Sequence, residues 1–317
     1  MDFGYDGYFM EFSRKALGLE ICQDEARLVL VGGKSHAPRL DAFCAVTFPP
    51  DTLRFSLREQ NVTNKASFIA KVRDAYLKML TTTRRISVSL PDSVGRVFVL
   101  DLETRFKTRT EGADMVRWKL KKSFPFDINE MHLDYQVLQE RDSGEVSTLV
   151  SLISRQVVMQ YEDLLVEAGL EPNRIDFTSF NMCRFFSSRL DFVENAALVA
   201  WHGRVLSILI FHNGILEFFR SKELSSSSNG TNRIFREIDN SLLFYQDKQP
   251  GYTMKEVFCI APHDEAAAFR AVIGEATGLV PVMLDAGRVI SRKDGLSVDG
   301  KTLYSLASAL GAAVRNL

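Results

Sequence analysis

The sequence contains two series of three short apolar runs, and predicted helices and strands alternate after each series. The runs lie at residues 16–22, 26–33 and 40–48, and again at 196–201, 205–211 and 215–220. Asn213-Gly214 separates the last two runs and is a strong hairpin signal, because a type I′ turn needs positive φ at both central positions. We therefore expect an internally duplicated α/β protein in which each half opens with three antiparallel strands.

Further helices and strands follow each series. In the first half, Asn64 can cap a helix that runs through Leu80, since apolar residues recur there at helical spacing, and residues 86–90 form the next strand. Gly169 is placed to end a helix over residues 157–168. The second half continues with a polar loop at 225–230, a long helix, a strand at 256–260, a helix at 264–277, a strand at 280–284 and a last helix at 302–314.

A smaller α+β unit interrupts the first half and begins at Pro91-Asp92. Strands are expected at 94–102, 131–139 and 149–154, with a helix at 111–123. The expected organisation is a first lobe over residues 14–91 and 151–190, an inserted subdomain over 92–150, and a second lobe over 191–317 with a helical insertion at about 225–250. The length of 317 residues suits two such lobes.

Composition and charge exclude several classes of protein. Lys and Arg number 39 against 40 Asp and Glu, so no excess of positive charge favours a dedicated nucleic-acid binder. The four cysteines are far apart and the five histidines show no ligand spacing, which predicts no metal site and suits the reduced thiols of a cytoplasmic protein. The first twelve residues carry three acids and no base, so no signal peptide is expected.

Four segments of the sequence resemble the PilM family of type IV pilus assembly proteins. They are LGLEI at 17–21, FPF at 124–126 with LDYQVL at 133–138, EAGLEP at 167–172, and ALGAAVR at 309–315. The resemblance implies an actin-like (ribonuclease H-like) bilobed α/β fold with a small α+β, SHS2-like subdomain inserted in the first lobe. The cell-division protein FtsA and the cytoplasmic part of the secretion protein GspL look similar.

The same resemblance implies a cytoplasmic adaptor in type IV pilus or type II secretion assembly. Such a protein binds the cytoplasmic tail of a PilN-type inner-membrane protein, and it is peripheral at the inner membrane only through that partner. Pilus motor or platform proteins are further candidate partners. The resemblance places the groove for the tail between the first lobe and the inserted subdomain. Trp118, Phe124 and Phe126 are candidate contacts, because aromatic side chains are frequent binding hot spots; alternatively, they form the small core of the insert.

An actin-like cleft holds phosphates on the backbone of two hairpin turns, which need Gly for close approach and Asp to organise a metal ion. This chain departs from that pattern in three places. In the first turn, Glu20 stands in place of Asp, Cys22 in place of Gly and Arg27 in place of Lys. In the second turn, Ala200-Trp201-His202 replaces Asp-x-Gly, and Ala261-Pro262 replaces the Gly-Gly of an adenosine motif. Cys22 and His202 add side chains where a phosphate would lie, and Asp24 and Glu25 add negative charge.

These departures predict a degenerate cleft with no bound cofactor and no ATP hydrolysis, and binding of ATP with Mg²⁺ is the alternative. Its residues are Glu20, Gln23, Arg27, His202, Gly203 and Ala261. Two interpretations of Glu20 and Arg27 stay open: a metal-organising acid with a phosphate clamp, or a surface ion pair, which we favour. The alternative functions are an active actin-like ATPase or sugar kinase, and an FtsA-like filament protein.

Two further patterns allow more than one interpretation. Residues 295–302 match the phosphate-binding pattern G-x-x-x-x-G-K-[ST], but Arg292-Lys293-Asp294 precedes them instead of a buried strand, which predicts a solvated turn before the last helix. A basic run faces either anionic lipid head groups or, as we favour, solvent on a helix surface. It comprises Arg105, Lys107, Arg109, Arg117, Lys119, Lys121 and Lys122.

Overall fold

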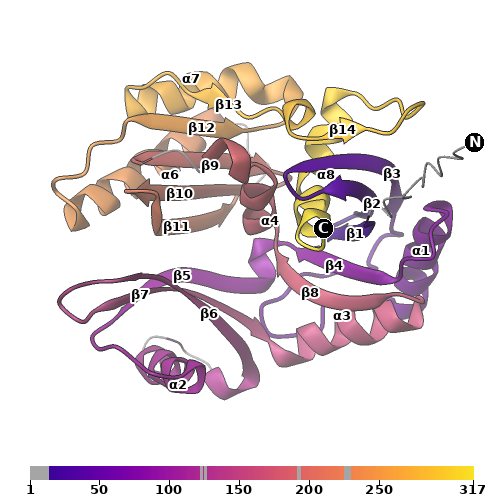
Figure 1. Cartoon of the computed structure of the whole chain (residues 1–317), viewed down its shortest axis with the longest axis horizontal. Coiled ribbons are helices and arrows are strands. Elements are labelled where there is room, and N and C mark those ends of the chain that lie inside the picture. Colours follow the sequence, from indigo (N-terminus) through magenta and orange to yellow (C-terminus); the bar gives the residue numbers. More distant parts are fainter. Residues whose placement is uncertain (1–13, 122–123, 125–126, 191–193, 225–229) are drawn as a thin grey trace, which may run out of the picture.

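The first of three sheets begins close to the N-terminus (Figure 1). The computed structural model describes residues 14–317 except 122–123, 125–126, 191–193 and 225–229. The strands of this sheet are β1 (Ala16–Ile21), β2 (Glu25–Lys34), β3 (Ala37–Thr47), β4 (Arg85–Leu90), β8 (Glu171–Phe177) and β14 (Ser291–Arg292), in the order β14-β3-β2-β1-β4-β8. Strands β1 to β3 are antiparallel, whereas β4 and β8 continue parallel to β1.

The second sheet repeats this topology. Its strands are β9 (Ala196–His202), β10 (Val205–His212), β11 (Ile215–Glu223), β12 (Glu256–Ile260) and β13 (Val282–Met283), in the order β11-β10-β9-β12-β13. Three antiparallel strands are again followed by two parallel ones, which is the predicted duplication. Asn213 and Gly214 have φ of 52° and 74°, as a type I′ turn requires.

The inserted subdomain has a sheet and a core of its own. It consists of β5 (Gly95–Leu102), α2 (Arg109–Leu120), β6 (Met131–Glu140) and β7 (Val146–Ser154), with strand order β5-β7-β6. Helix α2 covers one face, where Val116, Leu120 and Val150 are buried together. The opposite face contributes Leu138 and Leu149 to the core between the two lobes.

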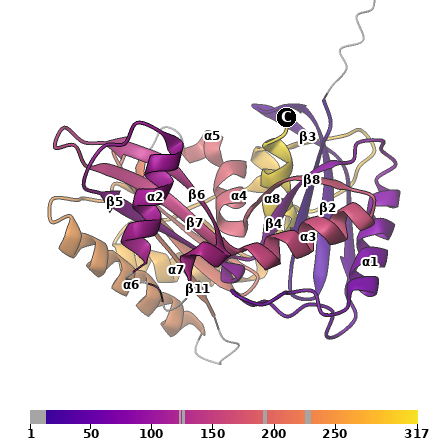
Figure 2. The ribbon, with the colours of Figure 1, turned by 90° about the horizontal axis from the view of Figure 1, so that it is seen from below.

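Helices cover both faces of the first sheet. On one face lie α1 (Lys65–Lys78) and α3 (Arg155–Glu167), side by side in Figure 2. Asn64 caps α1 by accepting a hydrogen bond from Ser67 N at 3.0 Å, as predicted. Gly169, with φ of 94°, ends α3 as predicted, and Leu170 N donates to Leu165 O at 3.0 Å.

The other helices surround the second sheet and the junction of the lobes. Helices α6 (Gly230–Lys248) and α7 (Ala266–Thr277) pack on the second sheet, and α4 (Thr178–Phe185), α5 (Ser187–Leu190) and α8 (Gly300–Val314) lie near the junction. Short 3₁₀ turns cover Asp92–Val94, Ile128–Glu130, His263–Glu265 and Ala286–Arg288. Within the described part of the chain, no helix is both long and apolar enough to cross a bilayer.

The last helix packs on the first sheet, although its residues fall within the segment expected to form the second lobe. Helix α8 contacts β1, β2 and β4 and crosses α4, and β14 also pairs with β3 of the first sheet. Two glycines allow this close approach. A Cβ atom at Gly18 of β1 would lie 2.0 Å from Ala309 O, and one at Gly311 of α8 would lie 1.8 Å from Asn181 O.

Substitution of Gly311 by alanine is expected to destabilise the fold. The added methyl group would overlap the backbone of α4, and overpacking of this kind costs about 1–3 kcal/mol. Urea denaturation of G311A, compared with G300A, measures the effect. Gly300 begins the same helix and has nothing within 4 Å of a built Cβ, so G300A should match the wild type. Equal midpoints for both variants would contradict the proposed helix contact.

Candidate functional site

A cavity of about 310 Å³ lies where the β1–β2 and β9–β10 turns face each other across the two lobes. Five of the six residues predicted for the cleft line it, namely Glu20, Gln23, Arg27, His202 and Gly203. The sixth, Ala261, is buried in the core of the second lobe and does not line this cavity. Residues of both predicted turns therefore line one cavity, whereas the adenosine-side position Ala261 lies outside it.

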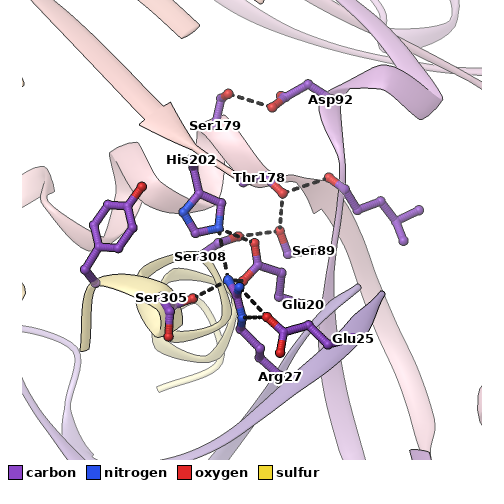
Figure 3. A network of polar contacts seen from close by, with 12 residues as sticks. Glu20, Glu25, Arg27, Ser89, Asp92, Thr178, Ser179, His202, Ser305 and Ser308 are labelled. Carbon is purple, nitrogen blue, oxygen red and sulfur yellow. Dashed lines mark hydrogen bonds and ion pairs between the residues drawn. The ribbon is translucent and has the colours of Figure 1, made fainter. Parts of the chain in front are cut away.

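Glu20 and His202 contact each other directly between the two turns. Glu20 Oε1 lies 2.7 Å from His202 Nε2 (Figure 3), and the side chains are only 1% and 8% exposed. Glu20 belongs to β1 of the first lobe, and His202 ends β9 of the second. This buried contact therefore joins the lobes at the point where the expected phosphate turns meet.

Arg27 completes a polar network around Glu20. Its Nη1 lies 3.2 Å from Glu20 Oε2 and donates to Ser305 O of α8 at 2.7 Å, while Nε donates to Glu25 Oε1 at 2.9 Å. Burial alone would raise the pKa of Glu20, but His202 and Arg27 outweigh it and lower that pKa. Glu20 and Arg27 do pair, but the expectation of a surface pair is wrong because the pair is buried between the lobes.

Asp92 is a cleft residue that the sequence pattern marked only as a boundary. Ser179 Oγ donates to its Oδ2 at 2.7 Å, and Ser179 Oγ also lies 2.5 Å from Ser207 Oγ of β10 (Figure 3 shows the first of these bonds). Burial raises the pKa of Asp92 to about 6, against the opposing effect of Ser179. Its buried Oδ1 has no hydrogen-bond partner among the described residues.

The cavity wall is acidic overall. It carries five carboxyl groups, from Glu20, Asp24, Glu25, Asp92 and Glu223, against the guanidinium groups of Arg27 and Arg204. Arg27 already pairs with two of these acids, and Arg204 Nε lies 3.6 Å from Glu223 Oε1. A triphosphate would meet uncompensated negative charge here, which is unfavourable at short range.

The described residues contain no group of three or more His, Cys, Asp or Glu side chains placed to hold a metal ion. Cys22, which could have been an exposed thiol, is half-buried on its turn. Burial and the neighbouring carboxylate of Glu20 raise the pKa of Cys22 well above its ordinary value. Its thiol therefore keeps its proton at neutral pH and is a poor nucleophile.

The predicted partner contacts do not form one site. Trp118 is 70% exposed and lines a hollow of about 590 Å³ between α2 and the end of β5. Phe124 is half-buried and its ring lies 5.8 Å from that of Phe98, within the core of the insert. Phe126 lies outside the described residues. The structure thus places Phe124 in the alternative role of core residue and leaves Trp118 as a surface candidate.

A third cavity, of about 450 Å³, lies where the insert meets the C-terminal end of α8. Phe106, Tyr135 and Val137 supply apolar surface, and Lys107, Arg109 and Arg315 supply charge. Strand β6, which carries Tyr135 and Val137, is an outer strand of its sheet and pairs only with β7 in the described part of the chain. Its free edge and this cavity together form an open groove.

The phosphate-binding pattern at residues 295–302 and the basic run of the insert both lie on the solvated surface. Asp299 caps α8 by accepting from Thr302 N at 2.7 Å, and exposed Lys301 pairs with Asp264 at 2.7 Å, so residues 295–302 form a solvated helix start. In the basic run, Arg105, Arg117 and Lys119 lie 3.6, 3.2 and 4.0 Å from acids of the insert, and Arg109 pairs with Asp134. These cations are largely neutralised on the surface of the insert.

Residues 18–241 match the sequence profile of a family described as type IV pilus assembly protein PilM. The chain belongs to this PilM family. No curated protein sequence matches the chain. The match covers the first sheet up to β8, the insert, and the first three strands of the second lobe, and it extends into α6.

Solved structures confirm the predicted fold. The structure of a PilM-PilN type IV pilus biogenesis complex is similar with a TM-score of 0.79 and 18% identity, over 95% of this chain and 98% of that chain. The cytoplasmic domain of EpsL, an inner-membrane component of the type II secretion system of Vibrio cholerae, has a TM-score of 0.50 and 10% identity, over 93% and 94%. The chain therefore has the actin-like fold with duplicated sheets that its sequence predicted.

Replacement of Asp92 by asparagine is expected to change how stability depends on pH. In the folded state the carboxyl keeps its proton up to about pH 6, whereas in the unfolded chain it ionises near pH 4. Wild-type stability should therefore fall as pH rises from about 4 to 6 and stay lower above it. D92N should be more stable than the wild type by up to about 3 kcal/mol at pH 8, and similar at pH 4.

Thermal and urea unfolding across this pH range measure the effect. D163N removes an exposed carboxyl of α3 and serves as the matched control, for which no comparable change is expected. A D92N protein that is less stable than the wild type at pH 8 would show that the ionised carboxylate is stabilised in the cleft.

Proposed function

We propose that this protein is an adaptor of type IV pilus or type II secretion assembly that binds the cytoplasmic tail of a PilN-type inner-membrane protein. It acts in the cytoplasm, is held at the inner membrane through that partner, and does not hydrolyse ATP. Membership of the PilM family supports the role in assembly. The likeness to a PilM-PilN complex supports the choice of partner.

The contact between Glu20 and His202 is the observation that carries the non-enzymatic part of the proposal. Phosphate binding in a cleft of this kind needs bare backbone N–H groups that point at the anion. Here a carboxylate and an imidazole meet at 2.7 Å between the two turns, and Arg27 is fully engaged with Glu20, Glu25 and Ser305. The groups that could bind a phosphate are therefore committed to one another.

The groove beside β6 is the proposed binding site for the tail. An extended peptide adds to a free strand edge through backbone hydrogen bonds, while alternate side chains enter neighbouring pockets. The free edge of β6 supplies the backbone groups, and Phe106, Tyr135 and Val137 supply an apolar surface beside it. The site lies between the insert and α8, which packs on the first lobe, as the family resemblance places it.

Mg-ATP is expected to bind too weakly to stabilise the protein. A ligand at one hundred times its Kd stabilises the folded state by about 2.7 kcal/mol, so even modest affinity would raise the melting temperature. We expect no measurable rise at millimolar Mg-ATP and no heat of binding in calorimetry. Micromolar binding, or release of phosphate that E20Q abolishes, would overturn the non-enzymatic part of the proposal.

A peptide from the cytoplasmic tail of a PilN-type protein is expected to bind the groove. V137E replaces an apolar contact surface of the groove with a hydrated carboxylate and should weaken binding about tenfold, because the apolar contact with the peptide is lost. L243E, on an exposed residue of α6, is the matched control. Fluorescence anisotropy with labelled peptide gives both affinities. Absence of binding to the wild type would contradict the adaptor role, and equal affinities for wild type and V137E would exclude this groove.

A further inference from the structure

The C-terminal end of α1 and the loop after it form a strongly basic segment. Residues 71–85 contain five basic side chains and one acid, Asp74. The basic residues are Lys71, Arg73, Lys78, Arg84 and Arg85. In the described part of the chain none of the five forms an ion pair with an acid, in contrast to the paired arginines of the insert.

Large apolar side chains are exposed among these cations. Leu77 is 63% exposed and Leu80 is 92% exposed, and Lys78 lies between them in the sequence. Arg73 Nη2 donates to Glu167 O at 2.5 Å, which places the C-terminal half of α1 against the end of α3, where Val166 is 61% exposed and acidic Glu167 follows it. We call Leu77, Lys78, Leu80, Arg84 and Val166 the α1-end surface.

Leu80 has a backbone conformation that leucine rarely adopts. Leu80 has φ of 48°, in the left-handed region that glycine adopts readily and bulky residues rarely adopt. A glycine would end α1 here without strain and without an exposed leucine. The chain instead presents a nearly fully exposed apolar side chain two residues after Lys78.

We propose that the α1-end surface binds the head-group region of an anionic lipid bilayer. Exposed leucines that insert at the acyl boundary, surrounded by cations that attract anionic head groups, are the two features of an interfacial membrane site. A nucleic acid would attract the same cations, but its binding would gain nothing from the leucines. The combination therefore favours a membrane over other polyanions.

The position of this surface allows lipid contact without blocking the other sites. In Figures 1 and 2, α1 lies at the opposite end of the molecule from α2 of the insert and from α6 and α7 of the second lobe. The groove beside β6 lies between the insert and the end of α8. Direct lipid contact goes beyond the proposed adaptor function, and its failure would leave peptide binding unaffected.

Vesicle co-sedimentation of the full chain tests the proposal. We expect binding to phosphatidylcholine vesicles that contain roughly 30% phosphatidylglycerol, weaker binding as salt rises, and none to pure phosphatidylcholine. K78Q/R84Q should lower the partition coefficient roughly 30-fold, which corresponds to about 2 kcal/mol for two surface charges. K255Q/R270Q removes two exposed cations of the second lobe and should bind as the wild type does.

L80G separates a membrane contact from a structural role. Glycine relieves the positive φ, so the melting temperature should stay the same or rise, while vesicle binding should fall severalfold. No binding of the wild type to anionic vesicles at low salt would overturn the proposal. Binding that K78Q/R84Q weakens and L80G does not, together with competition by duplex DNA, would also overturn it and indicate a general polyanion site.

Discussion

The buried contact between Glu20 and His202 is the interaction on which the rest of the molecule depends. A carboxylate withdrawn from water is costly unless cations and hydrogen-bond donors surround it, and removal of one partner leaves an uncompensated buried charge. Glu20 is 1% exposed and is satisfied by His202 from the second lobe and Arg27 from the first. The two lobes therefore stabilise each other through this network.

Side-chain contacts across a cleft affect how strongly a ligand can shift the equilibrium between its open and closed conformations. A ligand shifts a conformational equilibrium only by its differential affinity for the two states. Here Glu20, Arg27 and His202 already contact one another across the cleft, and the remaining wall is acidic. Outside the cleft, the outer edge of β6 and the exposed leucines at the end of α1 are the two surfaces for which we propose binding partners.

The sequence predicted the turns, caps and elements that depend on nearby residues. It did not predict contacts between segments that are far apart in the chain. Hairpin and cap signals such as Asn213-Gly214 and Asn64 act within a few residues. Cys22 and His202, which stand where the family pattern has glycine, both line the cavity between the lobes. The Asp92–Ser179–Ser207 chain joins three segments whose approach only the closed lobes define. Likewise, chain order assigned α8 to the second lobe, whereas its small residues pack on the first sheet.

Helix α8 connects the cleft to the groove beside β6. Its fifteen residues, Gly300–Val314, span about 22 Å as a rigid α-helix. Near its start, Ser305 O accepts from Arg27 in the cleft network, and just beyond its end Arg315 lines the groove. Along its length, α8 packs closely against β1 at Gly18 and against α4 at Gly311, where an added Cβ atom would overlap backbone. The cleft network and the groove beside β6 therefore both include residues of, or next to, one tightly packed helix.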